Sequence, residues 1–211
     1  MAESRNGSDR PGSEARGRRE PRETRAEGRA RRAEIDDPDI VLAAGLRFLE
    51  VRSRSVEEVR RRLTEAGYRP ELVAATLDRL ATIGLLDDEL FARAWIESRD
   101  RARPRGEIAL RRELGQRGVG REEISAALAE RQEAAEQLAR DWPSEDGDEP
   151  SGSPDEAAAR RLVERRRRDL DRIDDPRKRR ERAYALLARN GFDPDVCRTV
   201  AASVAPPATR P

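Results

Sequence analysis

GYRPELV, residues 67–73, is the first of three similar stretches in this chain. GVGREEI at 118–124 and GFDPDVC at 191–197 keep its order of glycine, apolar residue, acid and second apolar residue. A leucine precedes each glycine by four positions, at Leu63, Leu114 and Leu187. Glycine commonly ends a helix because it accepts the left-handed backbone conformation, and an acid favours the first turn of the next helix. The pattern predicts one helix–turn–helix joint, with Gly67, Gly118 and Gly191 as its structural glycines.

Apolar residues around these joints recur at helical spacing, and no alternation typical of strands competes with it. Each joint is therefore expected to lie between the second and third helices of a three-helix unit. Caps and prolines give the expected helix starts, which are Asp37-Pro38, Ser55, Pro70, Asp87, Pro104, Arg121, Pro176 and Asp193-Pro194. Apolar positions expected to face inward include Ile40, Val51, Ile108, Leu114 and, on the first helix of the third unit, Leu170.

The chain divides into three such units with polar segments around them. The N-terminal segment is rich in Arg, Glu, Gly and Ser, and the stretch at 141–156 has seven acids, three prolines and no base. Neither can bury enough apolar surface to offset its ordering entropy, so both are expected to be disordered. The expected organisation is a tail at 1–35, units at 36–84 and 85–140, an acidic linker at 141–156, a third unit at 157–205 and a frayed end at 206–211. A single unit of this size is marginally stable, which predicts an all-α, elongated and curved array of tandem repeats.

Composition excludes several classes of function. The 211 residues are 36% hydrophobic and 41% charged, so the chain cannot pack one large core. No apolar run is long enough for a membrane span, and no signal segment is evident, which favours a soluble cytoplasmic protein without membrane partners. Histidine is absent, which removes imidazole bases and most zinc sites. No phosphate-binding loop occurs, and no cofactor or metal is expected.

Two remaining features could suggest catalysis. Asp87 and Asp88 are adjacent acids, but neighbouring helical residues point about 100° apart and do not converge on one substrate atom. Capping of the following helix explains them better. Cys197 occupies the repeat position of Val73 and Ile124, which favours a buried structural thiol over a nucleophile. The chain is therefore expected not to be an enzyme, with a carboxylate-dependent hydrolase as a minor alternative.

Several motifs in the first two units are similar to those of one known family. They are RSRS at 52–55, Leu63 with Gly67-Tyr68, GLLDD at 84–88, Phe91-Ala92 with Trp95, and a basic turn leading to Leu114 and Gly118-Val119. Together they cover about residues 38–130, and they resemble the RecX family of regulatory proteins that modulate RecA recombinase. The N-terminal tail and the acidic linker are not part of the family pattern.

The resemblance implies a monomeric regulator in DNA repair, recombination and the SOS response. Its partner would be the RecA filament on single-stranded DNA, whose ATPase, strand-exchange and co-protease activities it would lower. Arginines grouped in the second and third units are candidates for this contact, because guanidinium pairs with carboxylate or phosphate. The candidates are Arg99, Arg101, Arg103, Arg105, Arg111, Arg112, Arg165 and Arg166.

Two other interpretations of these arginines remain open. They could be solvated faces paired with glutamate at helical spacing. The units could also be helix–turn–helix nucleic-acid binders, but their third helices, PELVAATLDRL and REEISAALAERQ, are acidic and alanine-rich. Such helices are poor readers of base edges in the major groove. Weak, salt-sensitive contact with single-stranded DNA through the arginines is compatible with the sequence.

Overall fold

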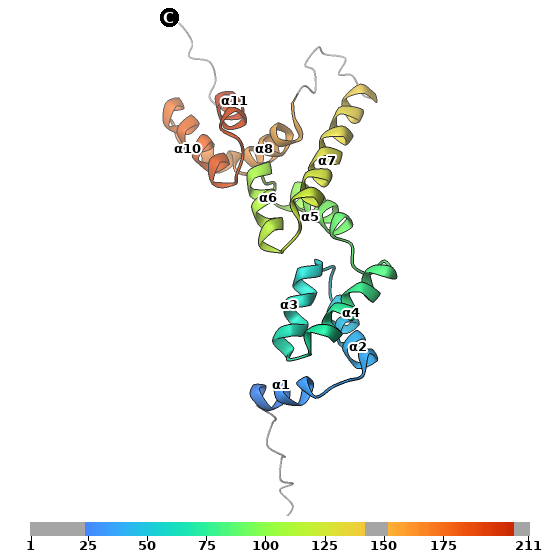
Figure 1. Cartoon of the computed structure of the whole chain (residues 1–211). Coiled ribbons are helices and arrows are strands. Elements are labelled where there is room, and N and C mark those ends of the chain that lie inside the picture. The colour runs from blue at the N-terminus through green and yellow to red at the C-terminus, as the bar shows by residue number, and fades with distance from the viewer. Residues whose placement is uncertain (1–23, 142–151, 205–211) are drawn as a thin grey trace, which may run out of the picture.

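The computed structural model describes residues 24–141 and 152–204, and these form helices and turns without a strand. The first group of helices comprises α1 (Arg25–Ala33), α2 (Pro38–Leu49), α3 (Val56–Ala66) and α4 (Pro70–Thr82). The second comprises α5 (Asp88–Ala102), α6 (Glu107–Gln116) and α7 (Arg121–Asp141). The third comprises α8 (Pro154–Arg165), α9 (Arg167–Asp171), α10 (Pro176–Arg189) and α11 (Pro194–Val204). Figure 1 shows the first group at one end of the molecule and the second and third groups beside each other at the other end, so the molecule is elongated.

Local sequence signals explain most helix ends. Asp37 accepts a hydrogen bond from the amide of Asp39, and Pro38 is the first residue of α2. Ser55 and Glu58 form a complete capping box at the start of α3. The three joint glycines have positive φ angles of 102° at Gly67, 80° at Gly118 and 76° at Gly191, which is the left-handed region that glycine accepts.

Each three-helix unit has its own hydrophobic core. Unit 1 (α2–α4) packs around Val59, Leu63 and Leu80, with Val41 and Leu77. Unit 2 (α5–α7) packs around a cluster that includes Phe91, Leu110, Leu114 and Ile124. Unit 3 (α8–α11) has α8, α10 and α11 as its first, second and third helices, with the short α9 between the first two. It packs around a cluster that includes Ala183, Leu187, Phe192, Val200 and the buried Cys197. Separate small cores agree with the low hydrophobic content, and the array is stabilised by contacts between neighbouring units.

The N-terminal region differs from the sequence prediction. Residues 25–33, expected to be part of a disordered tail, form α1, while residues 1–23 lie outside the described part of the chain. Thr24 and Glu27 make a capping box, and Gly28 is buried. The guanidinium of Arg32 donates to the carbonyl oxygen of Ala66 at 3.1 Å, so α1 docks on the end of α3. Composition missed this helix because tertiary contacts, and not apolar content, hold it.

The acidic stretch and α6 also differ from expectation. Asp141 belongs to α7, and α8 begins at Pro154 with Ser153 as its cap, so both ends of the expected linker are helical; residues 142–151 are not described. Capping by Ser153 explains the early start, because its side chain accepts from the amide of Glu156. Helix α6 begins at Glu107 and not at Pro104, since Arg103–Gly106 form the extended entry to a joint.

Some residues expected on inward faces are exposed. Ile40, Val51 and Ile108 have relative exposures of 45%, 79% and 55%. Val51 lies in the turn between α2 and α3, and Ile108 lies one position before the buried pair Ala109 and Leu110, which determines the inward face of α6. Leu170 is buried as expected, but it belongs to the separate short helix α9.

The described helices carry no membrane-spanning candidate, because none combines sufficient length with an apolar composition. Within residues 24–141 and 152–204, His, Cys, Asp and Glu also form no group suited to a metal ion.

Candidate anion-binding interface at the joint of units 2 and 3

Units 1 and 2 meet where the start of α3 touches the end of α6. The hydroxyl of Ser55 donates to the carbonyl oxygen of Arg117 at 2.5 Å. The guanidinium of Arg117 lies 2.5 Å from the Glu58 carboxylate, which is only 9% exposed, and it stacks on Trp95. The amide of Val56 donates to Asp88 at 3.0 Å. Polar contacts to helix ends therefore fix this joint, and they satisfy groups that a helix terminus leaves unpaired.

The negative charge of Asp88 is unfavourable at this joint. Burial raises the pKa of its carboxyl above the ordinary value of 3.8, with Glu123 and Asp87 acting in the same direction, while the hydrogen bond from Val56 lowers it. A carboxyl whose pKa is raised by folding binds its proton more tightly in the folded state. The protonated carboxyl therefore favours the folded state at acidic pH. This stability is lost as pH rises from the ordinary pKa of the unfolded chain to the raised pKa of the folded chain.

Asp88→Asn is expected to raise the thermal midpoint at neutral pH by a small amount. The amide oxygen can still accept from Val56, whereas the desolvation cost of the charge disappears. The advantage over wild type should shrink as pH falls below the ordinary carboxyl range, where wild-type Asp88 is protonated in both states. Thermal melts of the two proteins across a pH series measure this difference. A variant less stable than wild type at neutral pH, with the gap persisting in acid, would contradict the prediction.

Units 2 and 3 meet where the start of α6 touches the end of α10. The amide of Gly106 donates to the carbonyl oxygen of Asn190 at 3.1 Å. The next amide, of Glu107, donates to the Asp155 carboxylate of α8 at 2.9 Å. Asp155 thus serves as a remote cap for α6, a role in which a carboxylate is favourable at a helix N-terminus.

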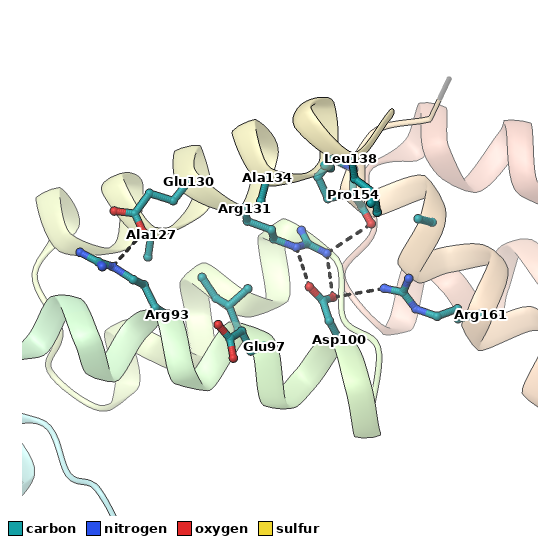
Figure 2. A pocket seen from close by; sticks show the side chains of 13 residues that line it. Arg93, Glu97, Asp100, Ala127, Glu130, Arg131, Ala134, Leu138, Pro154 and Arg161 are labelled. Atoms are coloured by element: carbon teal, nitrogen blue, oxygen red, sulfur yellow. Dashed lines mark hydrogen bonds and ion pairs between the residues drawn. The ribbon is translucent and has the colours of Figure 1, made fainter. Parts of the chain in front are cut away.

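A buried arginine connects three helices at the same joint, as Figure 2 shows. Arg131 of α7 makes two hydrogen bonds of 2.9 Å to Asp100 of α5 and one of 2.7 Å to Asp155 of α8. It also donates to the carbonyl oxygen of Pro154 at 3.4 Å. Its side chain is 10% exposed. Burial alone would lower the pKa of Arg131, but the hydrogen bonds to the two carboxylates outweigh burial and raise it.

Four of the predicted arginines surround one hollow beside this network. The arginine hollow is lined by Arg103, Arg105, Arg165 and Arg166, has a volume of about 190 Å³, and contains no carboxylate among the described residues that line it. Its other walls are Ala102, Pro104, Leu162 and Asn190. The first two arginines come from the segment that enters α6, and the other two from the end of α8. The fold therefore combines two arginine groups that are about sixty positions apart in the sequence.

Two of the four arginines of the hollow, Arg103 and Arg165, have no carboxylate partner among the described residues, whereas Arg105 and Arg166 each have one. Arg165 donates to the carbonyl oxygens of Ala102 and Arg101, both at 2.6 Å, which are uncharged partners. The side chain of Arg103 is exposed and makes no hydrogen bond or ion pair with another described residue, while its backbone amide donates to the carbonyl oxygen of Arg99. Arg166 is 60% exposed and lies 3.9 Å from Asp169. Arg105 bonds to Asn190 and lies 3.4 Å from Glu113. The hollow is suited to an anion, either carboxylate or phosphate.

The other predicted arginines do not share this site. Arg99 is 24% exposed, pairs with Glu113 at 2.6 Å and lies over the ring of Trp95, so it serves packing within unit 2. Arg101 is exposed and lies 3.5 Å from Glu97. Arg111 pairs with Glu107 at 2.8 Å on the exposed face of α6. The side chain of Arg112 is also exposed on α6 and has no hydrogen-bond or ion-pair partner among the described residues. The pairings of Arg101 and Arg111 match the interpretation of solvated, salt-bridged faces.

Comparison with known proteins supports the same architecture. Family models of the first, second and third three-helix domains of RecX match residues 42–80, 87–128 and 154–200. The regulatory protein RecX of Mycobacterium avium is 32% identical over 161 residues, which cover 76% of this chain and 82% of that protein. The regulatory protein RecX of Mycolicibacterium smegmatis is 45% identical over 101 residues, but this match spans only 54% of its length and 46% of this chain.

Solved structures show the same fold. The crystal structure of RecX from Lactobacillus salivarius superposes with a TM-score of 0.63 at 16% identity, covering 80% of this chain and 97% of the other. A second crystal structure, of a regulatory protein RecX, gives a TM-score of 0.60 at 20% identity and covers 77% of this chain and 72% of the other. The three domain matches in order, the identity to the Mycobacterium avium protein and the shared fold lead to one conclusion: this chain belongs to the RecX family of regulatory proteins.

Proposed function

We propose that this chain binds the RecA nucleoprotein filament and lowers its ATPase, strand-exchange and co-protease activities, with the arginine hollow as one point of contact. Membership of a regulatory family supports a protein partner in place of a substrate. The observation that carries the proposed contact is a hollow with four arginines and no lining carboxylate. A filament of protein on DNA presents both acidic side chains and phosphates, and guanidinium pairs with either.

The position of the hollow adds to its value as a contact point. It lies at the joint of two units, where the Arg131 network and the caps of α6 hold the backbone in place. Arg165 is positioned by two backbone carbonyls and Arg105 by Asn190, so these two side chains are already ordered before a partner binds. Ordered contact groups lose less conformational entropy on binding, which favours affinity.

The proposed function is tested with the RecA of the same organism. We expect the protein to lower the ATPase rate of RecA on single-stranded DNA in a dose-dependent manner and to bind the assembled filament in a pull-down. An ATPase rate unchanged at saturating protein, with no filament binding, would rule out this function for the chain.

Arg103→Glu with Arg166→Glu is expected to weaken filament binding about tenfold or more, which corresponds to ~1.4 kcal/mol. Each exposed contact contributes only ~0.2–1 kcal/mol, but reversal of both charges also introduces repulsion. Both side chains are exposed, so the thermal midpoint should stay near that of wild type. Arg105 and Arg165 are left intact because they hold the joint together. Filament binding by fluorescence anisotropy at several salt concentrations measures the loss.

Arg112→Glu with Arg121→Glu is the matched control, because both arginines are exposed on unit 2 and lie outside the hollow. The two substitutions change the net charge of the protein by the same amount. Equal losses for the two double variants would show that overall charge, and not the hollow, governs binding.

Direct binding of single-stranded DNA is the second candidate function, and the hollow favours it because phosphate suits the same guanidinium groups. Binding to bare single strands separates the two. A variant that loses the same factor on bare DNA as on the filament would assign the hollow to phosphate, whereas a larger loss on the filament would assign it to the RecA surface.

A further inference from the structure

The two joints between units are built from the same two contacts. At each joint, the carbonyl oxygen of the residue before the joint glycine accepts a hydrogen bond from the start of the second helix of the preceding unit. Arg117 accepts from the hydroxyl of Ser55, and Asn190 accepts from the amide of Gly106. In each, the joint glycine lies against the first turn of that helix. A methyl group on Gly118 would collide with Glu57, and one on Gly191 would lie 2.6 Å from the amide nitrogen of Ala109.

Helix α1 makes both contacts at the third joint glycine, where no preceding unit is described. The carbonyl oxygen of Ala66, the residue before Gly67, accepts from the guanidinium of Arg32. A methyl group on Gly67 would lie 2.7 Å from the carbonyl oxygen of Arg29. Helix α1 therefore occupies the surface that, at Gly118 and Gly191, receives the start of another unit's second helix. It has nine residues and is not part of a core cluster, so it covers this surface without continuing the array.

The complementary surface lies at the other end of the molecule and is exposed. The second helix of unit 3 is α10, and residues 174–178 at its start are all exposed. Asp174 and the cap Asp175 precede the first turn of α10, which itself has no acid and carries Arg177 and Lys178, while the last turn of α3 has no base and includes Glu65. The carbonyl end of a helix carries partial negative charge and the amide end partial positive charge, so the end of α3 suits the basic first turn of α10.

We propose that α1 is an end cap that prevents copies of this chain from joining head to tail. Without α1, the Gly67 surface of one copy is open to the start of α10 of a second copy, in the arrangement that the chain already uses twice internally. Such a contact joins different surfaces of identical molecules, and repetition of it produces an open chain of copies and not a closed dimer. The partner that fits the Gly67 surface is thus a second copy of the protein.

Arg29→Pro in the full-length chain tests the proposal. Proline in the middle of α1 removes a backbone donor and breaks the helix, and the fragments are too short to be stable alone. Arg25→Pro is the matched control, because residue 25 is the first of α1, where proline is tolerated. By sedimentation velocity over a range of concentrations, we expect wild type and Arg25→Pro to remain monomeric. Arg29→Pro should form species whose size increases with concentration.

A second pair of variants tests the route of association. Added to Arg29→Pro, Lys178→Glu places an acid at the start of α10, which suits that helix but repels the end of α3, and should reduce the association at least several-fold. Arg121→Glu makes the same charge change at the start of α7 and should leave association unchanged. A monomeric Arg29→Pro protein, confirmed by proteolysis to have released α1, would overturn the proposal. So would association that responds equally to Lys178→Glu and Arg121→Glu.

Discussion

Arg131→Met is expected to lower the free energy of unfolding by about 3–5 kcal/mol, the cost of breaking a buried ion pair by removal of one partner. Methionine reproduces the unbranched part of the arginine side chain as far as the position of Nε, but it lacks the guanidinium group. It cannot donate the hydrogen bonds that Arg131 makes to Asp100 and Asp155, whose side chains are 22% and 12% exposed. Two carboxylates would then face each other without the cation between them. Urea denaturation followed by circular dichroism measures the change.

Arg161→Met provides the control because it concerns the same carboxylate. Arg161 lies 3.8 Å from Asp100 and is 48% exposed. Figure 2 shows this pair beside the contacts of Arg131. Solvent screens this pair, so its loss should cost less than ~1 kcal/mol. Comparable losses for the two variants would show that burial does not distinguish them and that Arg131 is not central to the joint.

The fold was predictable from the sequence where the determining signals are local. Gly67, Gly118 and Gly191 end helices because of a conformational preference, and Ser55 with Glu58 caps α3 through residues three positions apart. Helix α1 was missed because its contacts come from residues 34 positions away, as between Arg32 and Ala66. No composition or periodicity within residues 25–33 indicates that partner.

The candidate site was predictable only as two separate arginine groups. The sequence indicated Arg103 and Arg105 near one joint and Arg165 and Arg166 in another unit, but their union in one hollow depends on how units 2 and 3 dock. Asp155 looked like part of a flexible acidic stretch, yet it bonds to both Arg131 and the amide of Glu107. Conversely, Arg99 looked like a contact residue, but Glu113, 14 positions away, binds it at 2.6 Å. Pairings between helices decide which charges remain available.

Gly191→Ala is expected to destabilise the protein by about 2–5 kcal/mol. An alanine at a φ of 76° carries a strain of roughly 1–2 kcal/mol. Its methyl group would also lie 2.5 Å from the Cβ atom and 2.6 Å from the amide nitrogen of Ala109, at the joint of units 2 and 3. Because one obstacle is helix backbone, no side-chain rotation can relieve the overlap, and crowding of this kind typically costs a further 1–3 kcal/mol.

Gly84→Ala separates the two contributions. Gly84 has a φ of 73°, close to that of Gly191, but nothing lies within 4 Å of the position of its missing methyl group. Its substitution therefore reports backbone strain alone, and the difference between the two variants reports the contact across the joint. Urea denaturation of both variants measures this difference.

If Gly191→Ala cost no more than Gly84→Ala, units 2 and 3 could move apart at the joint without loss of stability. The close approach of Ala109 would then contribute nothing to the docking of unit 3. A larger loss would show that glycine is required at this joint for two independent reasons, conformation and proximity. The same test then extends to Gly67, where the neighbour is α1.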